Sequence, residues 1–164
     1  MKTVLFFRHG KSDWDADYGA DHERPLAKRG RKAAAAMGRF LAQAGPLPDR
    51  ILTSSAVRAR ETLDRAMRAG GWDDRPVRVT RALYGADPGD LLDEVRKERD
   101  DARTLLLVGH EPTWSEAVSE AIGGGRLRFP TAALARVDFP ADHWADVSFG
   151  TGELVWFVIP KILP

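Results

Sequence analysis

Thr3-Val-Leu-Phe-Phe7 is an apolar run of strand length, and Arg8-His9-Gly10 follow it directly. A second apolar run, Thr104-Leu-Leu-Leu-Val108, is followed in the same way by Gly109-His110. Both runs predict buried strands, so each histidine is expected at the carboxyl end of a strand. In an α/β sheet the crevice outside these ends binds ligands, and two such strands lying side by side would bring both imidazoles to one pocket.

The triplet Arg8-His9-Gly10 is unusual for a segment that only has to pack. Arginine keeps its positive charge at physiological pH, and glycine allows the backbone to approach a ligand closely. The triplet therefore predicts a site that holds an anion against a histidine, with Gly10 as part of the binding loop.

Length and composition indicate one globular domain spanning residues 1–164, of which 43% are hydrophobic and 30% are charged. The 25 basic and 24 acidic side chains give a formal net charge of +1, which argues against nucleic acid and anionic lipid as partners. The chain has no cysteine, which excludes disulfides, thiolate zinc sites and cysteine nucleophiles.

The N-terminal apolar stretch is too short for a signal peptide or a membrane span. Arg8 cuts off the stretch Val4–Phe7, and no small-residue cleavage site follows it. We therefore expect a cytoplasmic protein that does not associate with a membrane.

Apolar runs of strand length alternate with longer stretches of helical period, which is typical of βαβ units. The last two runs, separated by a polar loop, resemble an added antiparallel edge. The pattern predicts an α/β fold, a three-layer α/β/α sandwich with a mostly parallel central sheet and an antiparallel edge strand. Strands are expected at 3–7, 50–53, 77–79, 104–108, 133–139 and 154–159, and helices at 27–44, from 54 or 55 to 70, after 87, and from 113 to 122.

Three helix starts have candidate caps. Ser54 or Ser55 would cap the second helix, and Asp87 followed by proline would cap the third. Thr113-Trp-Ser-Glu116 has the spacing of a capping box, so the positive end of the fourth helix is expected to face the pocket beside His110.

Three motifs carry a resemblance to a known family: Arg8-His9-Gly10, Ser54-Ser-Ala-Val-Arg58-Ala with Thr62, and Gly109-His110-Glu-Pro112. In order and spacing they resemble the histidine phosphatase superfamily. The resemblance implies that His9 is the nucleophile and that Arg8, Arg58 and His110 surround the phosphoryl group.

Further segments narrow the resemblance to one branch of that family. The segment Asp21-His-Glu-Arg24-Pro25-Leu26, Arg29-Gly30 and Leu83-Tyr84-Gly85 look most like phosphohistidine phosphatases related to SixA. This resemblance implies phosphohistidine on a protein as the substrate.

The same chemistry follows from the residue types. A phosphoryl group carries three charged oxygens, which two arginines and a second imidazole would bind, while a nucleophile attacks in line. A neutral imidazole is a competent nucleophile near pH 7, because its ordinary pKa is about 6.5. The resulting phosphohistidine would be attacked by water, so the mechanism needs no metal ion and no other cofactor. Both histidines are at strand ends; the resemblance selects His9, and Gly10 beside it favours the same choice.

No clear match exists for the carboxylate that many relatives use as a general acid. Asp21 is the candidate, because it lies in the Asp-x-x-Arg-Pro-Leu segment soon after His9, and Asp13, Asp15, Glu23 and Glu111 remain open. An alkoxide leaving group needs protonation, whereas an imidazole that is protonated on its other nitrogen leaves as a neutral ring. A weak or missing acid therefore favours nitrogen-linked phosphate as the substrate.

Two other functions remain open at this point. A shallow site would equally suit a broad small-molecule phosphomonoesterase, and a chain that had lost turnover would be a phosphate-binding module. Among nearby residues, Arg24 would pair with Asp21 or face water, Trp14 would line the pocket mouth or pack, and His22 and His143 are expected on the surface.

Overall fold

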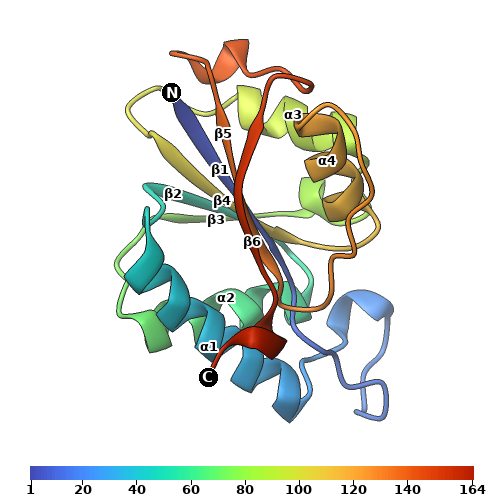
Figure 1. The fold of residues 1–164 in the computed structure, drawn as a ribbon. Coiled ribbons are helices and arrows are strands. Elements are labelled where there is room, and N and C mark those ends of the chain that lie inside the picture. Colours follow the sequence, from blue (N-terminus) through green and yellow to red (C-terminus); the bar gives the residue numbers. More distant parts are fainter.

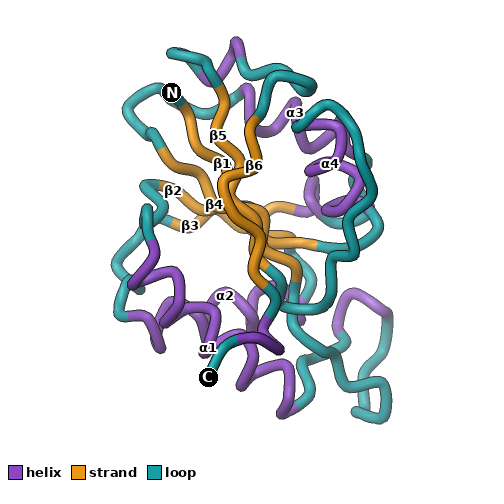
Figure 2. Tube along the Cα trace, in the orientation of Figure 1, coloured by secondary structure: helices purple, strands orange, loops and turns teal.

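The computed structural model describes residues 1–164, and six strands form one mixed sheet in the order β3-β2-β4-β1-β5-β6. Figure 2 shows this sheet running through the middle of the molecule with helices on both sides. The strands are β1 (Lys2–Arg8), β2 (Arg50–Ser54), β3 (Val77–Thr80), β4 (Thr104–Gly109), β5 (Leu134–Phe139) and β6 (Glu153–Val158).

Two helices cover each face of the sheet (Figure 1). Leu5 and Phe7 of β1 belong to an apolar cluster with α1 (Lys28–Ala44) and α2 (Val57–Gly70). Val4 and Phe6 point to the opposite face and join a second cluster with α3 (Pro88–Arg96) and α4 (Thr113–Ala121). This alternation is the period-two pattern of a strand buried on both faces, and it confirms the predicted three-layer sandwich.

The two strands that carry the histidines are neighbours, as predicted. β1 and β4 pair in parallel, with Arg8 opposite Gly109 at their carboxyl ends. β5 pairs antiparallel with β1, and β6 pairs antiparallel with β5, so the antiparallel addition predicted from the last two runs is confirmed. No helix of the structure is long and apolar enough to cross a membrane.

The predicted cap of α2 is wrong. This helix begins at Val57 after Ala56, and no side chain caps it. The hydroxyl of Ser54 instead accepts a hydrogen bond from the backbone N–H of Ala56 at 3.2 Å, while Ser54 itself still belongs to β2. The cap predicted for α3 is confirmed, because Asp87 and Asp90 form a reciprocal capping box.

The capping box predicted at Thr113 is also wrong. The Thr113 hydroxyl donates to the carbonyl of Ala86 at 2.5 Å, and Pro112 holds the cap position without a side-chain bond. The Glu111 carboxylate lies one position earlier and accepts bonds from both the N–H and the hydroxyl of Ser115, at 2.6 and 2.7 Å. The Glu111 carboxylate therefore accepts a hydrogen bond from a backbone N–H in the first turn of α4. Because Glu111 precedes the cap position, the spacing of a capping box does not identify it.

Candidate active site

The four side chains predicted to form the site lie together at one edge of the sheet. Arg8 ends β1 and His9 follows it, His110 follows β4, and Arg58 is the second residue of α2, which begins after β2. The ring centroids of His9 and His110 are 5.2 Å apart. Parallel strands place their carboxyl ends at the same edge, which is why segments 100 residues apart in sequence meet there.

His9 is held in one tautomer. Its Nδ1 lies 2.7 Å from the carbonyl oxygen of Gly10, which has no hydrogen to give, so Nδ1 must be the donor. A neutral ring with its hydrogen on Nδ1 leaves a lone pair on Nε2. The backbone therefore fixes which nitrogen of His9 is available to attack.

Burial keeps His9 neutral. The side chain is 7% exposed, and this desolvation lowers its pKa to about 3. The bond to Gly10 opposes the shift, and the positive charges of Arg58 and Arg8 add to it. At any pH above about 4, His9 is consequently an unprotonated imidazole.

His110 has a hydrogen-bond partner on only one ring nitrogen. Its Nε2 lies 2.7 Å from the Ser54 hydroxyl, and its buried Nδ1 has no partner. The Ser54 hydroxyl hydrogen faces no other acceptor, so it is placed to donate to Nε2 while the Ser54 oxygen accepts from Ala56. With this arrangement the ring hydrogen of His110 is on Nδ1. Desolvation and the charge of Arg58 lower the pKa of His110 to about 4. A neutral His110 would thus offer an N–H donor to an anion.

Both arginines are anchored through their terminal nitrogens. Arg8 Nη1 donates to the carbonyl of Phe129 at 2.9 Å. Arg58 Nη1 donates to the carbonyl of Asp21 at 2.8 Å, and its Nη2 donates to the Asp21 carboxylate at 3.0 Å. These bonds fix the position of each guanidinium before any ligand binds.

Four buried side-chain nitrogens in the chain lack a hydrogen-bond partner, and three of them are in this cluster: Arg8 Nε, Arg58 Nε and His110 Nδ1. Buried polar atoms in folded proteins are rarely left unpaired. All three are donors, and the cluster is positively charged, so a bound oxyanion would satisfy them. The arrangement is suited to a phosphate-sized anion beside Nε2 of His9.

The Asp21 carboxylate is hydrogen-bonded to side chains of the site. Its carboxylate pairs with Arg24 and Arg58 and accepts a bond from the Tyr84 hydroxyl at 2.8 Å. Burial raises the pKa of Asp21, but the bonds from Tyr84 and Arg24 and the arginine charges outweigh this and lower it to about 2. A carboxyl group with this pKa is almost fully ionised at neutral pH, which argues against the proton-donor role predicted for it.

The other candidate acids are also engaged or remote. Both oxygens of Glu111 bond to Ser115, Asp13 accepts from the N–H of Asp15, and Glu23 accepts from the N–H of Gly19. No hydrogen bond joins any of them to His9 or His110, which bond to Gly10 and Ser54. No group of three or more His, Asp or Glu side chains is placed to hold a metal ion.

Gly10 allows the loop after β1 to pass close to α1. A side-chain carbon at this position would lie 2.7 Å from the carbonyl oxygen of Gly30 in α1. The N–H of Gly10 already donates to the Thr62 hydroxyl, which in turn donates to the carbonyl of Arg58. The glycine therefore allows a close contact with α1, and its N–H is not free for a ligand.

Arg24 is buried and pairs with Asp21, which decides between the two alternatives left open by the sequence. Its guanidinium carbon lies 3.6 Å from the ring centroid of Trp14. Trp14 is 63% exposed, so it covers Arg24 from the solvent side. This stack stabilises the loop that carries Asp21.

Two side chains that were not predicted as site residues, Tyr84 and His22, lie next to His110 or to its neighbour. The Tyr84 ring lies 5.6 Å from that of His110 and 4.9 Å from that of His22, each pair edge to face. His22, expected on the surface, is half-buried, and its Nε2 lies 2.7 Å from the Ser55 hydroxyl. Tyr84 occurs in one of the quoted motifs, but nothing in the local pattern shows what its ring contacts.

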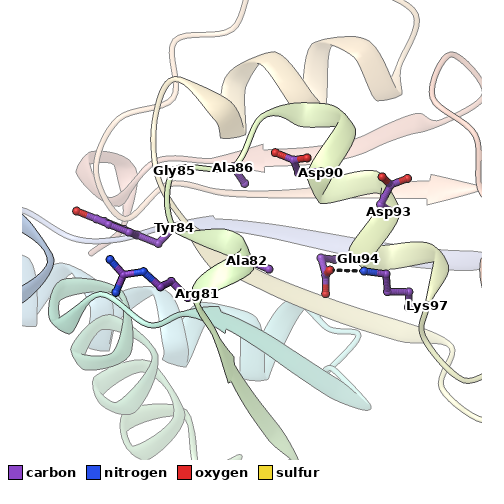
Figure 3. Close-up of a pocket in the computed structure, with 9 residues that line it drawn as sticks. All are labelled: Arg81, Ala82, Tyr84, Gly85, Ala86, Asp90, Asp93, Glu94 and Lys97. Carbon is purple, nitrogen blue, oxygen red and sulfur yellow. Dashed lines mark hydrogen bonds and ion pairs between the residues drawn. The ribbon is translucent and has the colours of Figure 1, made fainter.

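A shallow hollow of about 320 Å³ lies beside Tyr84. In Figure 3, Tyr84 and Arg81 extend to the same side, while Asp90, Asp93, Glu94 and Lys97 line the part formed by α3. Glu94 and Lys97 form an ion pair at 2.7 Å. Tyr84 thus borders this hollow and also contacts His110.

Comparisons with known proteins agree with this geometry. The family model of the histidine phosphatase superfamily (branch 1) matches residues 4–104. An uncharacterized protein of Mycobacterium tuberculosis is 41% identical over 167 residues, which cover 94% of this chain and 99% of that protein.

Two solved structures are similar over nearly their whole length. A protein from Nakamurella multipartitia assigned as phosphohistidine phosphatase SixA has a TM-score of 0.84 and 30% identity, covering 97% of this chain and 96% of its own. The protein histidine phosphatase SixA complexed with tungstate has a TM-score of 0.80 and 25% identity, covering 97% of both chains.

Proposed function

The chain belongs to the histidine phosphatase superfamily and is a phosphatase, and from this premise we propose that it acts through a covalent phosphohistidine on His9. We further propose that phosphohistidine on a protein is its substrate. Arg8, Arg58 and His110 bind the phosphoryl oxygens in this mechanism, and Asp21 positions Arg58.

The observation that carries the proposal is the bond from His9 Nδ1 to the Gly10 carbonyl, at 2.7 Å. It leaves the Nε2 lone pair free beside three unpaired donors, Arg8 Nε, Arg58 Nε and His110 Nδ1. A nucleophile and donors for the oxygens it must approach are therefore present in one cluster.

In the first step, the Nε2 lone pair of His9 forms a bond to phosphorus as the bond to the leaving atom breaks. If the leaving group is an imidazole protonated on its other nitrogen, it departs with its electron pair as a neutral ring. His9 becomes an Nε2-phosphorylated ring that keeps its hydrogen on Nδ1. Charge is conserved in this exchange, and no proton donor is needed.

In the second step, water attacks phosphorus and the bond between phosphorus and Nε2 breaks. The electron pair returns to Nε2, which restores neutral His9. Both hydrogens of the water stay on the product, which leaves as dihydrogen phosphate and loses a proton to solvent at neutral pH. The Gly10 carbonyl holds the Nδ1 hydrogen through both steps and stabilises the charged ring between them.

The state of the carboxylates supports a nitrogen-linked substrate. The pKa of Asp21 is lowered to about 2, and both carboxylate oxygens of Glu111 accept hydrogen bonds from Ser115. An alkyl phosphate would need a proton for its leaving oxygen, and neither group is suited to give one. The similarity to the histidine phosphatase solved with tungstate, a tetrahedral oxyanion, supports the same substrate class.

The test is a substrate panel run with acid-labile phosphate as a second readout. Wild type is mixed with a phosphohistidine peptide, an aryl phosphate and a sugar phosphate, beside His9→Ala and the control His143→Ala, whose ring is exposed and bonds to Asp100. We expect the peptide to be the best substrate and a protein-bound, acid-labile phosphate that only His9→Ala abolishes. Faster turnover of the esters would assign a small-molecule phosphomonoesterase, and binding without any adduct would assign a phosphate-binding module.

A further inference from the structure

Four aromatic rings form a row that leads from His9 to the protein surface. The centroid distances are 5.2 Å from His9 to His110, 5.6 Å from His110 to Tyr84 and 4.9 Å from Tyr84 to His22. His9 and His110 belong to the mechanism proposed above. The Tyr84 hydroxyl acts only through Asp21, and the rings of Tyr84 and His22 have no part in that mechanism, although they continue the same row.

The row also shows in which direction the site opens. His9 is 7% exposed, His110, Tyr84 and His22 are half-buried, and the Asp21 side chain bonded to Tyr84 is 50% exposed. Exposure therefore increases from the nucleophile toward Tyr84 and His22. A group that leaves phosphorus in line departs away from His9, and Tyr84 and His22 are the rings that continue the row beyond His110.

Both outer rings are fixed in place. The Tyr84 hydroxyl donates to Asp21 at 2.8 Å, and His22 Nε2 lies 2.7 Å from the Ser55 hydroxyl. The guanidinium of Arg81 lies 5.5 Å from the Tyr84 ring centroid. The rings contact one another nearly at a right angle, 85° between their planes, so they present a preformed aromatic corner.

We propose that Tyr84 and His22 form the leaving-group wall of the site, and that this wall selects an imidazole over a leaving group without a ring. The inference rests on the proposed function and names residues that determine its specificity. A planar heterocycle makes offset or edge-to-face contacts with such rings beyond simple burial of area, whereas an alkyl chain or ammonia does not. Tyr84 and His22 thus favour a leaving group that contains a ring. The groups that bind the phosphoryl oxygens do not distinguish between leaving groups.

The hollow that Tyr84 borders gives room for the polypeptide that carries the imidazole. Its volume is about 320 Å³, and it is lined by polar and charged side chains of α3 and by Gly85 and Ala86 (Figure 3). A phosphohistidine side chain inserted at Tyr84 would leave its own backbone at this outer surface. A free phosphate ester of small size would not reach it.

The experiment compares two substrates that share a phosphorus–nitrogen bond. A phosphohistidine peptide has an imidazole leaving group, and phosphoramidate has only ammonia, so the ratio of their kcat/KM values isolates the contribution of the ring. Tyr84→Leu removes the ring, and Tyr84→Phe keeps it and removes only the hydroxyl. His22→Gln removes the second ring and puts a side-chain amide where Nε2 bonds to Ser55.

We expect Tyr84→Leu and His22→Gln to lower the ratio of peptide to phosphoramidate by about threefold to tenfold each. Tyr84→Phe is the matched control, and we expect it to keep the wild-type ratio even if both rates fall through Asp21. Inhibition by N-acetylhistidine, which supplies the product ring, should weaken in the same two variants. Because His22→Gln is measured separately, it still tests the proposal if Tyr84→Leu folds poorly.

If both ring-removing variants keep the wild-type ratio of peptide to phosphoramidate and still form the His9 adduct, the proposed leaving-group wall is wrong. The proposed function would then still hold. A wild type that forms no acid-labile phosphate with either substrate would overturn both proposals. A ratio that falls equally in Tyr84→Phe would assign the effect to the hydroxyl and Asp21, and would also overturn the wall.

Discussion

Asp21 holds Arg58 with both its backbone and its side chain. The Asp21 carbonyl accepts from Arg58 Nη1 at 2.8 Å, and its carboxylate accepts from Nη2 at 3.0 Å. Two bonds to one residue leave the guanidinium little freedom to rotate. The residue first considered as an acid is thus placed to orient a phosphate-binding group.

Asp21→Asn should lower activity on every substrate by a similar factor, on the order of 10- to 100-fold, because it loosens Arg58. The measurement is kcat/KM for a phosphohistidine peptide and for an aryl phosphate. Tyr84→Phe, which removes one bond to the same carboxylate, should show a smaller effect of the same kind. A loss confined to the ester would instead identify Asp21 as a proton donor.

Ser54→Ala should impair the site through His110. The substitution removes the hydroxyl 2.7 Å from His110 Nε2, so the ring no longer has one preferred tautomer with its hydrogen on Nδ1. A net loss of about 1 kcal/mol for the bond predicts a fall in kcat of roughly fivefold. Nitrogen NMR of His110 would report the tautomer directly. Ser148→Ala serves as a control, and an unaltered tautomer in Ser54→Ala would contradict the assignment.

Stability should fall as the pH is lowered from 7 to 5, because two buried histidines remain neutral in the folded state. Burial lowers the pKa of His9 to about 3 and that of His110 to about 4. The unfolded chain takes up protons near pH 6.5 and the folded chain does not, so stability is present above pH 6.5 and is lost toward pH 3. Asp21, whose pKa is lowered from 3.8 to about 2, loses its contribution as the pH falls through these two values, so it does not affect the change between pH 7 and pH 5.

His9→Gln should therefore lose less stability than wild type between pH 7 and pH 5, by about 2 kcal/mol. Urea unfolding at the two pH values gives the difference in the free energy of unfolding. If the free energy of unfolding falls equally in wild type and in His9→Gln, His9 is protonated in the folded state.

Gly10→Ala should destabilise the protein by about 1 to 3 kcal/mol, since the added carbon would meet the Gly30 carbonyl at 2.7 Å. The shift would also move the neighbouring His9, so activity should fall with stability. Gly89→Ala is the matched control, because its nearest contact is a side-chain oxygen of Asp87 at 3.2 Å. Equal denaturation midpoints for the two variants would argue against the close contact with α1.

Much of this site can be predicted from the sequence. The apolar runs before Arg8 and before Gly109 predicted buried strands, and the alternation of elements predicted a parallel sheet. Asp87 was correctly assigned as a helix cap. The caps assigned to Ser54 and Thr113 were wrong, because both hydroxyls have stronger tertiary partners than the nearest helix end.

Hydrophobic periodicity and strand polarity are local properties of the chain, so they are enough to predict the sheet and the edge at which His9 and His110 meet. The ionised state of Asp21 and the positions of Tyr84 and His22 beside the site emerge only from the folded arrangement. Asp21 and Tyr84 are 63 positions apart, and their bond depends on how separate loops pack over the sheet. The pKa of a carboxyl group and the contacts of a ring follow from three-dimensional neighbours, which no spacing along the chain specifies.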